Sequence, residues 1–539
     1  MNHDNGREDS RLELQASLDG RKTSEERNRL GQYATPTLLA LDILQYAKQL
    51  APRGGIRFLD PAIGTGSFYS ALREVFGKQR VKAAIGFEID EHYGKPSAQF
   101  WKETDLKLQL ADFTATQAPR SETTKCNLVI CNPPYVRHHH LEAAEKIRLQ
   151  IEAERITGVK LSGLAGLYCY FMLLAHKWMA QDGVAGWLIP SEFMDVNYGS
   201  AIKRYLLANV TLLRIHRFDP NDVQFDDALV SSAVVWFKNS SPPANHSVQF
   251  TFGGSLLEPR VSRSVSASTL LAEPKWTRFP ISKERDTTSQ FTIADLLTIK
   301  RGIATGDNHF FIKTREEIEL QKLPMRFFKP ILPSPRALQS DEVEADARGW
   351  PVLDPQVFVL NCNLREEEVR RDWPTLWAYL ETGKPEVASG YLCTSRNPWY
   401  SQELRQPSPF LCTYMGRRDS KTGRPFRFIL NHSQAIAANV YLMLYPRPEL
   451  AAALAESRDL KSRIWQALNE IKSEVLLGEG RVYGGGLHKM EPRELAKVPA
   501  DKIAALIPSS ERPARQADLF EPVSVRAKTT SHFQLGLMT

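Results

Sequence analysis

The chain has 539 residues, of which 42% are hydrophobic and 24% are charged, and its net charge is +7. This length predicts at least two domains, and the composition is ordinary for soluble globular proteins. The sequence shows no apolar run long enough to span a bilayer and no secretory signal, and its six scattered cysteines predict neither a disulfide framework nor a zinc site. The modest positive charge permits nucleic-acid binding but does not establish it.

Residues 1–29 form a charged and polar N-terminal extension. The segment that follows, Leu30-Gly-Gln-Tyr-Ala-Thr35-Pro36, leads into an expected helix over residues 37–50, in which apolar residues recur at helical spacing. Pro36 suits the first turn of a helix. By itself, a Thr-Pro pair at this place indicates only that a helix starts there.

Residues 56–60 read as a short apolar strand that ends in Asp60 and runs into a loop with Gly64 and Gly66. Beyond the loop, apolar residues from Phe68 onward recur at helical spacing. A strand, a glycine turn and a helix in this order let the backbone approach a nucleotide-like ligand closely. A lone Gly-x-Gly is weak evidence, and the missing third glycine of the dinucleotide fingerprint argues against NAD.

Two further expected strands end in acidic residues. Residues 83–87 run into Glu88, where an acid typically binds the ribose hydroxyls of an adenosine. Residues 108–111 run into Asp112 and Phe113, which offer an acceptor for an amino group and an apolar edge for adenine.

The apolar run of residues 127–131 predicts a buried strand, and it is closed by Asn132-Pro133-Pro134-Tyr135. Two consecutive prolines fix the backbone and remove donors, so the chain leaves the sheet in a stiff, extended shape. That shape holds the Asn132 amide and nearby carbonyl groups outward beside an aromatic ring. The arrangement suits a flat amino group attached to a ring, although a strand followed by a Pro-rich turn is the simpler interpretation.

The remaining strands complete an α/β domain. A helix begins at Gly166, and residues 182–190, 212–218 and 231–237 are expected strands. Together with the four strands above, they predict a seven-stranded, mostly parallel, Rossmann-like domain over residues 30–240.

The second half of the chain is expected to be a separate domain. Residues 241–290 are rich in Ser, Pro and Thr and are interpreted as a connector with some strand content. Residues 291–505 are expected to form an α+β domain with helices over residues 446–476, and residues 506–539 have no clear pattern, which is typical of a disordered tail. A dense basic cluster in this half suits phosphate contacts, although a charge run is more often a solvated surface.

His138, His139 and His140 follow the proline motif directly. Three adjacent side chains do not converge easily on one ion, so no metal site is predicted, and the histidines are assigned to a loop. No Pro-Asp…Asp/Glu-x-Lys arrangement stands out, so a fused nuclease is not expected.

The order of these motifs, from the acid and Gly-x-Gly to Asn-Pro-Pro-Tyr, resembles the S-adenosylmethionine-dependent amino-methyltransferases. The Gly31-x-x-x-Thr35-Pro36 segment makes the chain more similar to the gamma-class DNA adenine-N6 methyltransferases of type II restriction–modification systems, the TaqI-like enzymes. In that class, this segment leads into a helix that covers the methionine end of the cofactor. Segments similar to Arg301-Gly-x-x-Thr305-Gly begin the target-recognition region in larger members.

The resemblance implies roles for the motif residues. The residues expected to bind S-adenosylmethionine are Tyr33, Thr35, Pro36, Asp60, Ala62, Gly64, Gly66, Glu88, Ile89, Asp112, Phe113 and Asn132. The expected catalytic residues are Asn132, Pro133, Pro134 and Tyr135, and Tyr135 and Phe225 are expected to stack on the target base. The residues expected to contact DNA are Arg301, Thr305, Arg417, Arg418, Lys421, Arg424, Arg481 and Lys489.

The function that the resemblance implies is methylation of adenine N6, on a base flipped out of double-stranded DNA, by a monomeric cytoplasmic enzyme of a bacterium or archaeon. The methylation would protect the site from a separately encoded endonuclease. Three alternatives stay open. The chain could methylate guanine N2 in ribosomal RNA or a protein glutamine, it could methylate cytosine N4, or it could be a catalytically idle DNA-binding regulator.

Overall fold

The computed structural model describes residues 5–219, 231–280, 289–417, 423–457, 459–483 and 486–508. These residues fall into two compact units. The first takes its described residues from Met1–Asp286, Met415–Phe426 and Lys472–Met490, and the second takes them from Thr287–Tyr414, Arg427–Ile471 and Glu491–Thr539. The chain therefore passes between the two units more than once.

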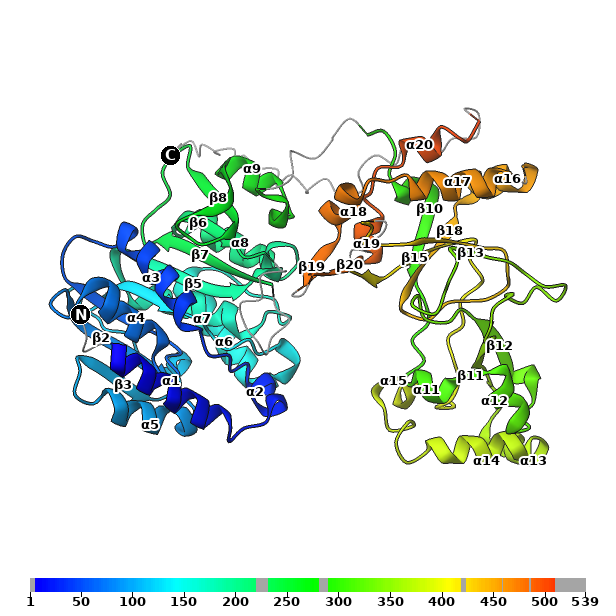
Figure 1. The fold of residues 1–539 in the computed structure, drawn as a ribbon, viewed down its shortest axis with the longest axis horizontal. Helices are drawn as coiled ribbons and strands as arrows, with labels where there is room; N and C mark the ends of the chain where they lie inside the picture. Colours follow the sequence, from blue (N-terminus) through cyan, green and yellow to red (C-terminus); the bar gives the residue numbers. More distant parts are fainter. Residues whose placement is uncertain are drawn as a thin grey trace, which may run out of the picture. The chain divides into compact units, whose positions relative to one another are not determined.

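The described part of the first unit is built on a nine-stranded sheet with the order β3-β2-β1-β4-β5-β7-β6-β8-β9 (Figure 1). The five strands from β3 to β5 pair in parallel, and β7 lies antiparallel between β5 and β6. The strands are β1 (Ile56–Asp60), β2 (Val81–Glu88), β3 (Leu106–Leu110), β4 (Cys126–Cys131), β5 (Met179–Pro190), β6 (Thr211–Arg217), β7 (Ser232–Lys238), β8 (Ser247–Gly254) and β9 (Pro259–Ser266).

The expected count of seven strands is too low, because the supposed connector over residues 241–290 supplies β8 and β9. Strand β8 pairs in parallel with β6, and β9 pairs antiparallel with β8. Within β8, Val248 and Phe250 are buried while Ser247 and Gln249 are exposed. This alternation is the usual signature of a half-covered strand, and it is visible in the sequence.

Alternate residues of the central strands face two different cores. Phe58 and Leu128 belong to one core, while their neighbours Leu59 and Val129 belong to the other. Apolar residues on both faces are typical of parallel strands covered by helices on each side. The strand pattern therefore determines that the helices form two layers.

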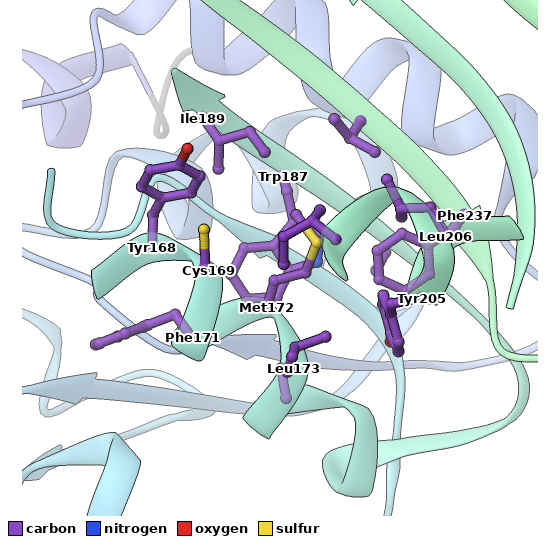
Figure 2. Packing of buried hydrophobic residues seen from close by; sticks show 14 of the residues in the cluster. Tyr168, Cys169, Phe171, Met172, Leu173, Trp187, Ile189, Tyr205, Leu206 and Phe237 are labelled. Carbon is purple, nitrogen blue, oxygen red and sulfur yellow. The ribbon is translucent and has the colours of Figure 1, made fainter. Parts of the chain in front are cut away.

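Helices cover both faces of the sheet. Helices α3 and α4 contribute to the core that contains Phe58, and α7 and α8 contribute to the other. Figure 2 shows the second core, in which Met172 of α7, Trp187 of β5 and Tyr205 of α8 lie together. The helices of this unit are α1 (Asn5–Asp19), α2 (Ser24–Leu30), α3 (Thr37–Leu50), α4 (Ser67–Phe76), α5 (Glu91–Trp101), α6 (Ala143–Thr157), α7 (Leu167–Ala175), α8 (Gly199–Ala208), α9 (Ala267–Ala272) and α18 (Ser473–Glu479).

The second unit contains both helices and strands. Its described strands form a five-stranded sheet, β10-β18-β15-β17-β13, and a three-stranded sheet, β11-β14-β12. The strands are β10 (Leu297–Arg301), β11 (Ile312–Thr314), β12 (Phe328–Ile331), β13 (Glu342–Val343), β14 (Val357–Leu360), β15 (Phe410–Thr413), β17 (Phe428–Asn431) and β18 (Tyr441–Pro446). The helices are α10 (Ile293–Leu296), α11 (Asn308–Phe311), α12 (Arg315–Leu320), α13 (Glu366–Asp372), α14 (Pro374–Gly383), α15 (Tyr391–Thr394), α16 (Pro448–Glu456), α17 (Leu460–Asn469), α19 (Pro492–Leu495) and α20 (Asp501–Ala504).

A third sheet, β16-β20-β19, comes from the second half of the sequence but belongs to the first unit. Its strands are β16 (Met415–Gly416), β19 (Arg481–Tyr483) and β20 (Leu487–Lys489). Buried polar contacts fix its neighbouring segment to this unit. The Lys275 ammonium donates to the carbonyls of Glu479 and Gly480, and the Arg278 guanidinium pairs with the Glu479 carboxylate. Residues 291–505 are therefore not one continuous domain.

Among the helices of the described ranges, none combines the length and the apolar character that crossing a membrane requires.

Candidate active site

The expected site residues lie where neighbouring parallel strands end. Asp60 ends β1, Glu88 ends β2, and Asn132 follows β4 directly. Because parallel strands end at the same edge of a sheet, this topology gathers their side chains where open α/β folds bind ligands.

The glycine loop is held by its neighbours and leaves open space at one position. The Gly64 amide donates to the Glu88 carboxylate at 3.1 Å, and the Ala62 amide donates to Asp60 at 3.2 Å. Gly64 has a φ of +55°, and a Cβ placed on it would meet nothing within 4 Å. Gly66 is different, because a Cβ there would lie 2.6 Å from the indole nitrogen of Trp101. Gly66 therefore serves packing, and Gly64 leaves room for a ligand.

Two acids lie near each other at the ends of β1 and β2. Burial, together with a smaller effect of the Glu88 carboxylate, raises the pKa of Asp60 to about 8, although a hydrogen bond from the Ala62 amide opposes the shift. Burial also raises the pKa of Glu88, although amide hydrogen bonds from Asp90 and Gly64 oppose that shift. A cationic group or a hydroxyl donor placed between the acids would favour their charged forms.

The side chains after β2 and β3 differ in how much surface they offer. Ile89 is 71% exposed and presents an apolar surface beside Glu88. Phe113 is only 3% exposed and packs against Phe87 at a centroid distance of 5.4 Å, so little of its ring can reach a ligand. Asp112 accepts hydrogen bonds from the Thr114 amide and hydroxyl at 2.8 and 2.7 Å. The adenine contacts of Asp112 and Phe113 stay predictions.

Of the two polar side-chain atoms of Asn132, one is hydrogen-bonded within the protein and the other is not. Its amide nitrogen donates to the Tyr33 carbonyl and to the Thr35 hydroxyl, at 3.1 Å each. Its amide oxygen is buried and accepts no hydrogen bond within the described structure. Leaving a buried acceptor unpaired costs about 1–3 kcal/mol. The two donated bonds fix the orientation of the amide, so this oxygen is presented as an acceptor to an incoming donor.

Tyr135 is anchored at both its backbone and its hydroxyl. Its amide donates to the Gly31 carbonyl at 3.2 Å, and its hydroxyl donates to the Leu188 carbonyl at 3.1 Å. Its ring lies 5.7 Å from the Tyr33 ring, with an interplanar angle of 44°. Between Asn132 and Tyr135, Pro133 is buried and Pro134 is partly exposed.

Gly31 explains why the segment before the glycine loop can contact the proline motif. Its φ is +64°, and a Cβ on Gly31 would lie 2.4 Å from the Tyr135 amide nitrogen. Only glycine combines this backbone conformation with so close an approach. The Gly-x-x-x-Thr-Pro segment and the Asn-Pro-Pro-Tyr motif therefore form one structural site.

The residues expected to contact DNA are only partly brought together. Thr305 is 2% exposed and its hydroxyl donates to Asn308 at 2.7 Å, so a DNA contact by this side chain is not supported. Arg301 lies over the Tyr414 ring at 4.0 Å in the second unit.

Lys489 and Arg481 are cross-strand neighbours in the small sheet of the first unit. Arg417 directly follows β16 of that sheet, and Arg424 is exposed in the same unit. Phe225, Arg418 and Lys421 lie outside the described residues.

No motif in residues 1–29 indicated that they contact this site. Helix α1 buries Arg11, whose guanidinium donates to the hydroxyl of Thr65 in the glycine loop at 3.0 Å. An arginine in a polar helix usually indicates a solvated face, so sequence periodicity alone could not have identified it.

Glu342, Glu344 and His432 in the second unit have ligand atoms within 4.8 Å of one another. The Lys461 ammonium lies 3.4 Å from the His432 ring nitrogen and supplies a positive charge at the same place. This cluster is largely exposed to solvent, and we do not assign it as a metal site.

Two family models match this chain. The Eco57I restriction-modification methylase model matches residues 69–224, and the model for the C-terminal domain of the Type II methyltransferase M.Eco57I matches residues 274–528. The chain is 28% identical over 481 residues to the Type II methyltransferase M.XamI of Xanthomonas campestris pv. amaranthicola, covering 87% of this chain and 85% of that protein. It is 25% identical over 497 residues to M.AccI of Acinetobacter calcoaceticus, covering 88% and 85%.

Solved structures of restriction enzymes also match, at low identity. The type IIL restriction-modification enzyme MmeI in complex with DNA is 14% identical, with a TM-score of 0.49 over 84% of this chain and 64% of that chain. The type IIG restriction endonuclease BpuSI is 14% identical, with a TM-score of 0.41 over 87% and 60%. The chain therefore spans less than two thirds of either enzyme.

The chain is therefore similar to Type II restriction–modification methylases in two separate parts, residues 69–224 and residues 274–528, and over most of its length to M.XamI and M.AccI.

Proposed function

We propose that this protein transfers a methyl group from S-adenosylmethionine to N6 of an adenine that is flipped out of double-stranded DNA. The observation that carries the proposal is the buried Asn132 amide oxygen, which accepts no hydrogen bond within the described structure. An exocyclic amino group carries two hydrogens in the plane of its ring. A fixed acceptor beside an aromatic ring suits such a group better than it suits a carboxylate or a phosphate.

The residues at the strand ends fit the proposed cofactor. Asp60 and Glu88 offer carboxylates for the cationic and hydroxyl groups of S-adenosylmethionine, and the exposed Ile89 offers an apolar surface for its adenine. The open space at Gly64 lets the backbone approach the ligand. When bound, the cofactor supplies a methyl group on a positively charged sulfur, which is already a good leaving group.

The chain's own residues are proposed to prepare the nucleophile. The lone pair of adenine N6 is delocalised into the ring, so the amino group is a poor nucleophile. The Asn132 amide oxygen and the Pro133 carbonyl would each accept a hydrogen bond from one of its two hydrogens. These two bonds would favour a tetrahedral nitrogen. The free lone pair can then point at the methyl group. Positioning and preorganised hydrogen bonds can supply catalysis of this kind.

Tyr135 is proposed to hold the extruded base. Flipping a base costs a few kcal/mol, and stacking on an aromatic ring is worth about 1–3 kcal/mol per base. The Leu188 carbonyl anchors the Tyr135 hydroxyl, so the ring loses little freedom when a base arrives. Phe225 is proposed as the second stacking residue on the sequence argument alone.

The choice of adenine rests on Asn132. Enzymes that methylate cytosine N4 usually have Ser or Asp at this position, and methyltransferases of glutamine or ribosomal guanine generally lack the Gly31–Thr35–Pro36 segment. The relatives are named Type II methyltransferases. We therefore also propose that the protein acts as a monomer and protects DNA from a separately encoded endonuclease.

Long-read sequencing of modified bases tests this function directly. DNA from cells that express the wild-type chain should carry N6-methyladenine in one short sequence context. DNA from cells that express Asn132→Ala should lack it. Methylation of cytosine, or unmodified DNA in cells that contain folded wild-type protein, would contradict the proposal.

A further inference from the structure

Helix α1 contacts the cofactor region through polar side chains. One face of this helix combines Arg11, which is 1% exposed, and Leu18, which is 3% exposed, with the partly buried Gln15. These residues are spaced three and four apart, so they share one side of the helix. A helix that only stabilised the fold would be expected to bury apolar side chains, because burying an arginine carries a large desolvation cost.

Arg11 joins two segments that flank the proposed cofactor site. Its guanidinium donates to the Thr65 hydroxyl at 3.0 Å, and Thr65 lies between Gly64 and Gly66. It also donates to the Thr37 hydroxyl at 3.3 Å, at the start of α3. One side chain therefore ties the glycine loop to the first turn of α3.

The other members of this network are paired as well. Glu8 accepts two hydrogen bonds from Arg11, at 2.8 and 2.6 Å, and one from the Thr37 hydroxyl at 2.5 Å. The Thr65 hydroxyl donates to the Gln15 side chain at 2.5 Å. Burial alone would raise the pKa of Glu8, but hydrogen bonds from Arg11, Ser70 and Thr37 hold it below the usual value. A charged Glu8 keeps the Arg11 guanidinium in one orientation.

The network includes Thr37, which is close in sequence to the segment that contacts the proposed catalytic amide. Thr37 is two residues from Thr35, and the Thr35 hydroxyl accepts a hydrogen bond from Asn132. Buried ion pairs add little net stability on average, whereas they can fix one geometry out of several. The position of this pair between the glycine loop and the Thr35 segment suits the second role.

We propose that Arg11, held by Glu8, is a positioning residue of the cofactor site: through Thr65 and Thr37 it fixes the glycine loop relative to the segment that orients Asn132. This inference rests on the proposed binding of S-adenosylmethionine. It assigns a function to residues 1–29, which otherwise read as an extension ahead of the methyltransferase motifs.

The test measures the affinity for S-adenosylmethionine and for its unreactive analogue sinefungin by titration calorimetry. Arg11→Met should weaken both about 10-fold, a change of about 1.4 kcal/mol that lies within the range of coupling energies between contacting residues. Arg21→Met removes an exposed arginine that follows the same helix, and it should leave both affinities unchanged. Thermal unfolding without ligand reports separately on any loss of stability.

A second pair of variants keeps the test decisive if Arg11→Met does not fold. Thr65→Val removes only the hydroxyl and should weaken binding, whereas Thr65→Ser keeps the hydroxyl and should restore it. The double variant Arg11→Met with Thr65→Val should lose less than the sum of the two single losses, because both substitutions remove the Arg11–Thr65 hydrogen bond. Wild-type affinity in Thr65→Val and in any folded Arg11→Met would overturn the inference, whatever happens to the unfolding temperature.

The failure of this inference differs from the failure of the proposed function. If the wild-type protein binds S-adenosylmethionine but no DNA base is methylated, the proposed function fails while the positioning role is still supported by the variants. If the wild-type protein methylates adenine and the variants bind the cofactor normally, only the positioning role fails. A wild-type protein that binds no S-adenosylmethionine would overturn both.

Discussion

The side-chain nitrogen of Asn132 lies 3.1 Å from the hydroxyl oxygen of Thr35, although 97 residues separate the two in the chain. Thr35 is 7% exposed, so this hydrogen bond is protected from water. It fixes which end of the Asn132 amide faces the protein and leaves the amide oxygen as the open acceptor. The segment ahead of the glycine loop thus determines the orientation of the proposed catalytic group.

Replacing Thr35 tests this relationship. Thr35→Val keeps the volume but removes the hydroxyl, so Asn132 loses one of the two bonds that orient it. A hydrogen bond contributes about 1 kcal/mol net, so single-turnover methylation should fall roughly 5-fold. Thr35→Ser retains the hydroxyl and should stay near the wild-type rate. Equal rates for Thr35→Val and the wild type would show that the Thr35 bond is not needed to orient the amide.

The need for glycine at position 31 can be tested by comparison with Gly158, which has a similar backbone conformation but no close neighbour. Gly31→Ala should cost more stability than Gly158→Ala. Both glycines have positive φ, +64° and +69°, but a Cβ on Gly31 would lie 2.4 Å from the Tyr135 nitrogen, while one on Gly158 meets nothing within 4 Å. The left-handed conformation alone costs a non-glycine residue about 1–2 kcal/mol.

Chemical denaturation of the two variants measures the difference in their free energies of unfolding. The excess loss in Gly31→Ala reports the contact with the proline motif. Similar losses in the two variants would mean that Gly31 is required only for its φ angle.

The sequence predicted the local elements of the site well. The expected helix over residues 37–50 and the expected strand over residues 56–60 are confirmed as α3 and β1 with the same bounds. Their signals are local, because helical spacing, strand hydrophobicity and the fixed backbone of proline act over a few residues.

Long-range packing was not predictable in this way. Phe113 is buried by Phe87, Phe171 and Trp178, which come from three different elements, so its position in the sequence did not reveal its burial. Arg11 is buried, and one of its hydrogen-bond partners, Thr65, is 54 residues away in the chain. The small sheet of the first unit likewise pairs strands that are distant in the sequence. Between β16 and the strands β19 and β20, the chain enters the second unit and returns. Such contacts depend on tertiary structure that periodicity does not encode.

Tyr135 is expected to act on the flipped base rather than on the duplex as such. Tyr135→Ala should weaken binding to intact DNA more than binding to a site whose target adenine is mispaired, because the mispaired base costs less to extrude. The difference should approach the stacking energy of about 1–3 kcal/mol. Tyr135→Phe keeps the ring and loses only the bond to Leu188, so it is the matched control. Equal losses on both DNAs would argue against stacking of an extruded base.

Asp60 should make the stability of the ligand-free protein depend on pH. Its pKa is raised from 3.8 to about 8, chiefly by burial. As the pH rises from about 4 to about 8, the unfolded chain gives up this proton while the folded chain keeps it, so Asp60 lowers the free energy of unfolding across that window. Asp60→Asn removes the titration and retains the shape.

Thermal unfolding over this pH range measures the effect. The stability of Asp60→Asn relative to the wild type should increase steadily as the pH rises. Glu88 is present in both proteins, so its own raised pKa cancels in the comparison to the extent that it does not depend on Asp60. A difference between the two proteins that does not change with pH would show that Asp60 is ionised in the folded state throughout.

Single-turnover methylation by Asn132→Ala, with the affinity for S-adenosylmethionine measured on the same protein, is the most direct test of the account. Loss of one preorganised acceptor of this kind should reduce the rate at least about 100-fold, while the cofactor affinity stays within about a factor of two of the wild type. A variant that binds the cofactor normally and still methylates DNA at the wild-type rate would contradict the assignment of the Asn132 amide oxygen as the acceptor of the amino hydrogens.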